Sequence, residues 1–198
     1  MIKRLVYYKL GLAYFFLMFV LYMFLPKWVA DENLIIENLQ LLWLAAGLNC
    51  CCRAKKHIYK DWLGDAKALW SAGMVYFFLL FMREISWGRT LISNPDGSMI
   101  QYSQMGLYGM LVHPLVVCLL ILLLALLYKA CVWRMLRSID FPFEGFLMLI
   151  LFIYGSWVAE KGHIMGFYGQ VAEELAELGA YMMMYFLLND VIYQLKIK

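Results

Sequence analysis

The most apolar stretch of the chain, Leu107–Tyr128, reads LYGMLVHPLVVCLLILLLALLY and contains no lysine, arginine, aspartate or glutamate. A helix that crosses the hydrocarbon of a bilayer needs about 20 mainly apolar residues, because each residue adds only about 1.5 Å along the axis. The length and composition of this stretch therefore predict a transmembrane helix.

The composition of the whole chain supports the same fold class. Of 198 residues, 65% are hydrophobic and 16% are charged, whereas a soluble domain has about 45–50% apolar and about 25% charged residues. A core of this size cannot bury so much apolar surface, so lipid must cover much of it. We expect an all-α polytopic membrane protein. The sequence shows no basic patch of the kind that binds nucleic acid.

Five further apolar runs have the length of membrane spans. The first is followed by Pro26-Lys27-Trp28 instead of a small-residue cleavage site, so we interpret it as a retained helix and not as a signal peptide. The sequence thus predicts one domain over residues 1–198, a bundle of six transmembrane helices. The predicted spans are Leu10–Leu25, Leu34–Cys52, Ala66–Trp87, Leu107–Tyr128, Phe143–Ala159 and Val171–Leu195.

The basic residues predict the orientation of this bundle. With the N-terminus inside, thirteen of the 17 lysines and arginines lie in inner segments, and nine of the 14 acidic residues lie in outer ones. Lysine and arginine concentrate on the cytoplasmic side of membrane proteins. We therefore expect both termini in the cytoplasm, and a bacterial inner (plasma) membrane as the location.

The longest outer segment, Gly88–Gly106, contains a turn signature, Asn94-Pro95-Asp96-Gly97. Proline presets φ for such a turn, and glycine accepts the left-handed conformation. The flanking stretches Thr90–Ser93 and Ser98–Tyr102 have the composition of short strands. The pattern predicts a small extracytoplasmic hairpin between the third and fourth spans.

Polar residues gather at the predicted outer ends of four spans, around Arg83-Glu84-Ile85-Ser86-Trp87-Gly88-Arg89 at the end of the third. Ionisable residues at such a depth are costly and are functional candidates. We expect a polar pocket at headgroup depth that opens outward. Its expected lining is Arg83, Glu84, Ser86, Trp87, Arg89, His113, Glu160, His163, Glu173 and Glu177.

The residue types suggest two roles within this pocket. Arginine side chains can hold an anionic headgroup with two parallel hydrogen bonds, and glutamate or histidine can supply acid–base chemistry. The catalytic candidates are Glu84, His113 and Glu173. The binding candidates are Arg83, Ser86, Trp87, Arg89 and Glu177.

A metal site is a further hypothesis. Glu160 and His163 have the Glu-x-x-His spacing of di-iron bundles, which require two such pairs, and this chain has one. Together with His113 they could hold a single divalent metal ion. No particular cofactor follows from the sequence.

Two carboxylates of the sixth span, Glu173 and Glu177, are four residues apart and share one helix face. They repel each other unless a cation, an arginine or a proton lies between them. The alternative to a functional site is a structural ion pair between the third and sixth spans, with Arg83 or Arg89 as the cation.

Three functions are compatible with this pattern. The first is a binding or assembly component of a membrane system, with membrane lipids, a protein partner or a second copy of the chain as its partners. The second is an intramembrane enzyme, a hydrolase or transferase that acts on a lipid or lipid-linked substrate at the outer leaflet. The third is a proton or ion carrier that uses Glu173 and Glu177.

Overall fold

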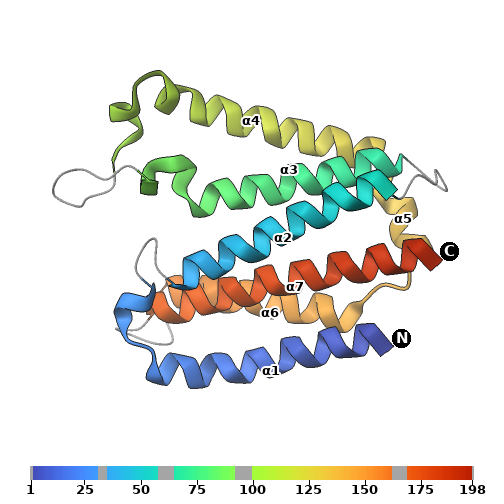
Figure 1. Ribbon diagram of the computed structural model, residues 1–198, viewed down its shortest axis with the longest axis horizontal. Coiled ribbons are helices and arrows are strands. Elements are labelled where there is room, and N and C mark those ends of the chain that lie inside the picture. Colours follow the sequence, from blue (N-terminus) through green and yellow to red (C-terminus); the bar gives the residue numbers. More distant parts are fainter. Residues whose placement is uncertain (1, 31–34, 58–64, 92–99, 162–168, 198) are drawn as a thin grey trace. The chain divides into compact units, whose positions relative to one another are not determined.

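The computed structural model describes residues 2–30, 35–57, 65–91, 100–161 and 169–197, and these residues form helices without any strand (Figure 1). The six long helices are α1 (Ile2–Phe24), α2 (Ile35–His57), α3 (Ala66–Glu84), α4 (Gly106–Lys129), α6 (Phe143–Glu160) and α7 (Gly169–Ile197). The shorter ones are α5 (Val132–Ser138) and the 3-10 helices η1 (Lys27–Ala30), η2 (Ser86–Leu91) and η3 (Tyr102–Met105). The all-α fold is therefore confirmed.

Five helices are long and apolar enough to cross a membrane, namely α1, α2, α4, α6 and α7. This supports an integral membrane protein. Helix α3 is not among the five, since it carries Lys67 in its first turn and Arg83 and Glu84 in its last. The third span and the orientation of the chain stay predictions.

The chain divides into two compact units, and α2 contributes to both. Unit 1 comprises Met1–Ala46 and Ile139–Lys198, and unit 2 comprises Gly47–Ser138. A division by contacts does not by itself separate folding domains, so the prediction of a single domain stays a prediction.

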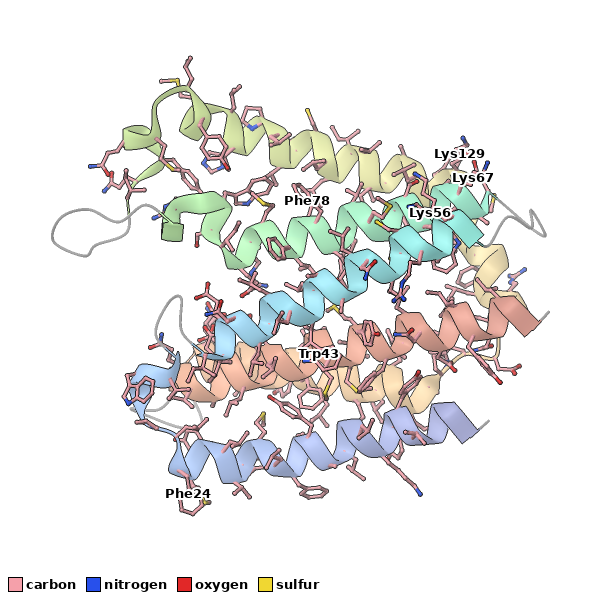
Figure 2. All side chains as sticks on the ribbon, in the orientation of Figure 1. Phe24, Trp43, Lys56, Lys67, Phe78 and Lys129 are labelled. Carbon is pink, nitrogen blue, oxygen red and sulfur yellow. The ribbon has the colours of Figure 1, made fainter. Side chains whose placement is uncertain are left out.

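In unit 1, α6 and α7 lie side by side and α1 packs against both (Figure 1). Close packing depends on small residues: Gly179 of α7 faces the ring of Phe152, whose side chain is almost completely buried. The first part of α2 contributes Trp43, whose ring lies 5.3 Å from that of Tyr185 and 5.8 Å from that of Phe186 (Figure 2). Aromatic and small residues together thus form this core.

In unit 2, α3 and α4 pack along each other (Figure 1). Helix α3 begins after Asp65, whose carboxylate accepts a hydrogen bond from the Ala68 amide at 2.9 Å. The same carboxylate lies 3.1 Å from Nζ of Lys129, at the end of α4. Figure 2 shows Lys67 and Lys129 at this end of the unit. Asp65 therefore caps one helix and links it to the end of the other.

The segment between α3 and α4 differs from the sequence prediction. Helix α3 ends at Glu84 and not at Trp87, because Ser86, Trp87 and Gly88 have positive φ angles of 44°, 56° and 85°. The described ends of the predicted strands are helical: Thr90 and Leu91 belong to η2, and Tyr102 begins η3. A capping box between Gln101 and Gln104 favours the helical turn over a strand. The predicted turn at 94–97 lies outside the described residues.

Candidate functional site

The end of unit 2 where α3 ends and α4 begins contains a left-handed turn of three residues. Ser86 and Trp87 adopt positive φ without being glycine, which costs each of them roughly 1–3 kcal/mol. Two tyrosine hydroxyls hold the turn: Tyr108 donates to the carbonyl oxygen of Trp87 at 2.9 Å, and Tyr102 donates to that of Ser86 at 3.4 Å. Strained backbone supported in this way is a feature of functional sites.

Tyr102 also brings Arg89 and His113 together. The guanidinium carbon of Arg89 lies 4.8 Å from the centre of the Tyr102 ring, and the imidazole of His113 meets the same ring edge to face at 5.4 Å. Nε of Arg89 donates to the carbonyl oxygen of Ile100 at 2.7 Å. We name Arg89, Tyr102 and His113 the arginine–tyrosine–histidine cluster. Within the part of the chain that the structure describes, the two Nη atoms of Arg89 make no hydrogen bond.

The first two charges of the predicted stretch point in different directions. The Arg83 side chain is 59% exposed, whereas that of the adjacent Glu84 is only 7% exposed. Nε of Arg83 lies 3.8 Å from Oε1 of Glu84. Neighbouring residues on a helix are about 100° apart, which explains how one side chain is buried while the next is not. Glu84 is thus a buried carboxylate at the end of α3.

A second polar group lies in unit 1, where α2 approaches α7. The side chain of Gln40 is completely buried, and its Nε2 donates to the carbonyl oxygen of Glu174 at 3.0 Å and to Oε2 of the same residue at 2.8 Å. Oε1 of Gln40 is buried without a hydrogen-bond partner among the described residues. A buried acceptor without a donor is costly, so this position is a candidate for binding a cation.

The remaining predicted site residues of unit 1 are found on α6 and α7. Glu173 and Glu177 are half-buried on α7, and Oε1 of Glu177 lies 3.4 Å from the hydroxyl of Ser156, which donates to it. Glu160 is exposed at the end of α6. His163 lies outside the described residues, so its proposed pairing with Glu160 stays a prediction.

The residues of the predicted pocket are distributed over the two units. Arg83, Glu84, Ser86, Trp87, Arg89 and His113 belong to unit 2, and Glu160, Glu173 and Glu177 belong to unit 1. A single pocket lined by all of them stays a prediction. In the described ranges, no three His, Cys, Asp or Glu side chains are close enough to hold a metal ion. The metal hypothesis with His113, Glu160 and His163 therefore has no support from the described residues.

Several residues of these polar groups were not among the predicted site residues. Tyr102 and Tyr108 lie in or near a segment whose composition indicated a strand, so no pattern of residues placed them beside Trp87 and Arg89. Gln40 could have been found from the sequence, since it is an amide inside an otherwise apolar run. A polar residue in a span usually faces the protein interior, as Gln40 does.

The described residues form an all-helical fold compatible with an integral membrane protein, with a strained, arginine-bearing turn between α3 and α4. The chain matches no protein-family model, no curated protein and no solved structure. Its function must therefore be argued from its own residues.

Proposed function

We propose that this protein is a lipid-binding component of a membrane system, and that the arginine–tyrosine–histidine cluster binds the phosphate of an anionic lipid. One observation carries the proposal: Arg89 is held in place through Nε and through its stacking on Tyr102. Among the described residues its two Nη atoms have no hydrogen-bond partner, so a ligand can use these donors. A guanidinium recognises a phosphate through two parallel hydrogen bonds, and fixing it beforehand reduces the entropy lost on binding.

The position of the cluster suits a lipid headgroup. It lies where α3 ends and α4 begins, and α4 is among the helices apolar enough to span a membrane. His113 is seven residues into α4, about 10 Å along its axis from the first residue. The headgroup region is about 5–8 Å thick on each side, so His113 lies near the boundary between headgroups and hydrocarbon when α4 enters the membrane at its first turn. With the predicted orientation, the lipid belongs to the outer leaflet.

The test is lipid binding to the purified full-length protein in mild detergent, measured by native mass spectrometry. The probes are short-chain phosphatidic acid and phosphatidylcholine. We expect Arg89→Gln to weaken binding of phosphatidic acid about tenfold or more, because a hydrogen bond to a charged group contributes roughly 1.5–3 kcal/mol and 1.4 kcal/mol is tenfold. Arg89→Lys should restore only part of the affinity, since lysine lacks the planar fork.

The matched control is Arg137→Gln, which removes the same charge from the same unit. Arg137 also stacks on an aromatic ring, with its guanidinium carbon 5.2 Å from the ring centre of Trp133. Equal losses for Arg89→Gln and Arg137→Gln would mean that only net charge matters, and would refute the proposal. Equal affinity of the wild-type protein for both lipids would refute it as well.

A second candidate function, a proton or ion carrier, is favoured by Oε1 of Gln40, which lies beside Glu174 and has no hydrogen-bond partner among the described residues. If unit 1 carries an ion at this position, protein reconstituted in liposomes should show flux driven by a pH or sodium gradient. Gln40→Leu on α2 should abolish the flux, whereas Gln170→Leu, at an exposed position of α7, should not. Liposomes without any such flux would eliminate this candidate.

The hypothesis of an intramembrane hydrolase or transferase stays a prediction, and no contact among the described residues favours it specifically. It would require that Glu84→Gln or Glu173→Gln change the lipids that the purified protein converts.

A further inference from the structure

An apolar groove of about 290 Å³ runs along unit 1 between α1, α6 and α7. One wall consists of Phe15, Met18 and Phe19 of α1, and the opposite wall includes Phe152 and Tyr154 of α6. Its floor is made by small residues, Gly155 and Ala159 of α6 and Ala172 and Ala176 of α7. This volume is close to the lower end of the range of ligand pockets, about 300–1,000 Å³.

Ring contacts fix the walls of the groove. The Phe15 ring meets Phe19 of the same helix edge to face at 5.2 Å, and it meets Phe152 of α6 at 6.0 Å. Behind them, the Tyr14 hydroxyl donates to the carbonyl oxygen of Leu175 at 2.8 Å, which fixes α1 against α7. The groove is therefore built into the packing of the three helices and does not depend on one flexible side chain.

The groove is open to the medium that surrounds the helices. Its rim residues Phe19, Leu151 and Tyr154 are 39%, 39% and 62% exposed. The three helices that form it are all apolar and long enough to span a membrane. At this depth the surrounding solvent is hydrocarbon, and an apolar site does not hold water.

The groove residues also share one half of the unit. They come from the second half of α1, from α6 between its middle and its end, and from the first half of α7, where α1 and α6 end and α7 begins. A lipid acyl chain extends through one leaflet only, which is about half of the hydrocarbon thickness. A groove that covers half the length of a span can therefore be filled by an acyl chain from one leaflet. In the predicted orientation, this is the outer leaflet.

From these observations we infer that the groove binds one acyl chain of a membrane lipid. The driving force is not transfer out of water, because a lipid tail is already in an apolar medium. It is the dispersion contact between the chain and the fixed aromatic walls, which a fluid bilayer cannot match. The inference concerns the chain and not the headgroup, so it is independent of the proposed phosphate site in unit 2.

Photolabelling tests the inference. Full-length protein in detergent micelles without other lipid is irradiated with increasing amounts of phosphatidylcholine that carries a diazirine on its acyl chain, and the labelled peptides are quantified. We expect labelling of the α1 and α6 groove residues to saturate, while labelling of Leu124, a 67% exposed residue of α4, rises in proportion to the probe. Phosphatidylcholine has no net charge, so failure here would leave the proposal for Arg89 intact.

Two variants sharpen this experiment. Gly155→Leu places a side chain in the groove and should lower the saturable labelling about tenfold, because the leucine takes the volume of the acyl chain. Ile150→Phe adds bulk on the same α6 at a lipid-facing position that does not line the groove, and should leave the labelling unchanged. Labelling that never saturates in the wild-type protein would overturn the inference, even if Gly155→Leu failed to fold. Unchanged labelling of a folded Gly155→Leu would overturn it too.

Discussion

The carbonyl oxygen of Tyr102 lies against Gly109, at the place where any other residue would carry its Cβ atom. Gly109 is buried on α4, and the contact brings η3 onto the first turns of that helix. The side chains of Arg89 and His113 both contact the ring of Tyr102. The absence of a side chain at Gly109 thus sets the position of the arginine–tyrosine–histidine cluster.

Gly109→Ala should therefore displace Tyr102 and weaken the binding of phosphatidic acid. The obstacle is a backbone oxygen, which cannot rotate away as a side chain can. We expect a loss of about 1–3 kcal/mol in stability, which is typical of overpacking, together with reduced lipid affinity. Thermal unfolding and native mass spectrometry measure the two effects. The control is Met110→Ala. Met110 follows Gly109 on α4, and the residue is 70% exposed. Unchanged lipid binding by Gly109→Ala would show that Tyr102 does not position the ligand.

Tyr108→Phe should destabilise the left-handed turn. The Tyr108 hydroxyl donates to the carbonyl oxygen of Trp87, which has an unfavourable φ of 56°. Removing one hydrogen bond should lower the free energy of unfolding by about 0.5–1.5 kcal/mol. Tyr128→Phe removes the same hydroxyl from the other end of α4, where the residue is 88% exposed, and should have almost no effect. Equal unfolding temperatures for the two variants would contradict this role.

The link between Asp65 and Lys129 should make unit 2 less stable in acid. The hydrogen bond from the Ala68 amide, followed by that from Lys129, lowers the pKa of Asp65 below its usual value of about 3.9. A carboxyl group with a lowered pKa stabilises the folded state above its unfolded-state pKa, and that stabilisation is lost as the pH falls through the folded-state pKa. At neutral pH the folded state therefore keeps the full stabilisation that the Asp65 carboxylate provides.

Asp65→Asn tests this contribution, because asparagine can still cap α3 but cannot pair with Lys129 as an anion. The unfolding temperature of the wild-type protein should exceed that of the variant at pH 7, and the difference should shrink toward pH 2. Added salt should reduce the difference at pH 7, because Lys129 is exposed and its attraction is screened. A difference that stays constant from pH 7 to pH 2 would mean that charge is not involved.

The helices were predictable from the sequence because membrane spans leave a strong compositional signal. The fifth predicted span, Phe143–Ala159, differs from α6 by one residue at its end, and Leu107–Tyr128 differs from α4 by one residue at each end. The charges of Lys67, Arg83 and Glu84 weaken the same signal for α3. The short α5 was not predicted, since seven residues with two arginines resemble a loop.

The candidate site was predictable only in part. The stretch Arg83–Arg89 was identified because charge at the end of an apolar run is unusual. Its geometry depends on the left-handed turn at Ser86 and Trp87, and neither residue type favours positive φ. Tyr102 and Arg89 are thirteen positions apart, and their contact has no periodic pattern that a sequence could reveal.

Two glycines of unit 1 offer a matched test of its packing, because the same substitution should have opposite effects. A Cβ atom at Gly179 would lie 2.7 Å from two ring atoms of Phe152 and 2.9 Å from the Tyr14 ring, whereas at Gly155 its nearest neighbour would be the Ala176 Cβ at 3.8 Å. Alanine is favoured over glycine in a helix by roughly 0.5–1 kcal/mol. Gly155→Ala should gain this amount. Gly179→Ala should lose about 1–3 kcal/mol, since the Phe152 ring is buried and the Tyr14 ring is fixed by its hydrogen bond to Leu175. Reversible unfolding in mixed detergent micelles measures both variants, and a stabilised Gly179→Ala would show that α6, α7 and α1 pack less closely than described.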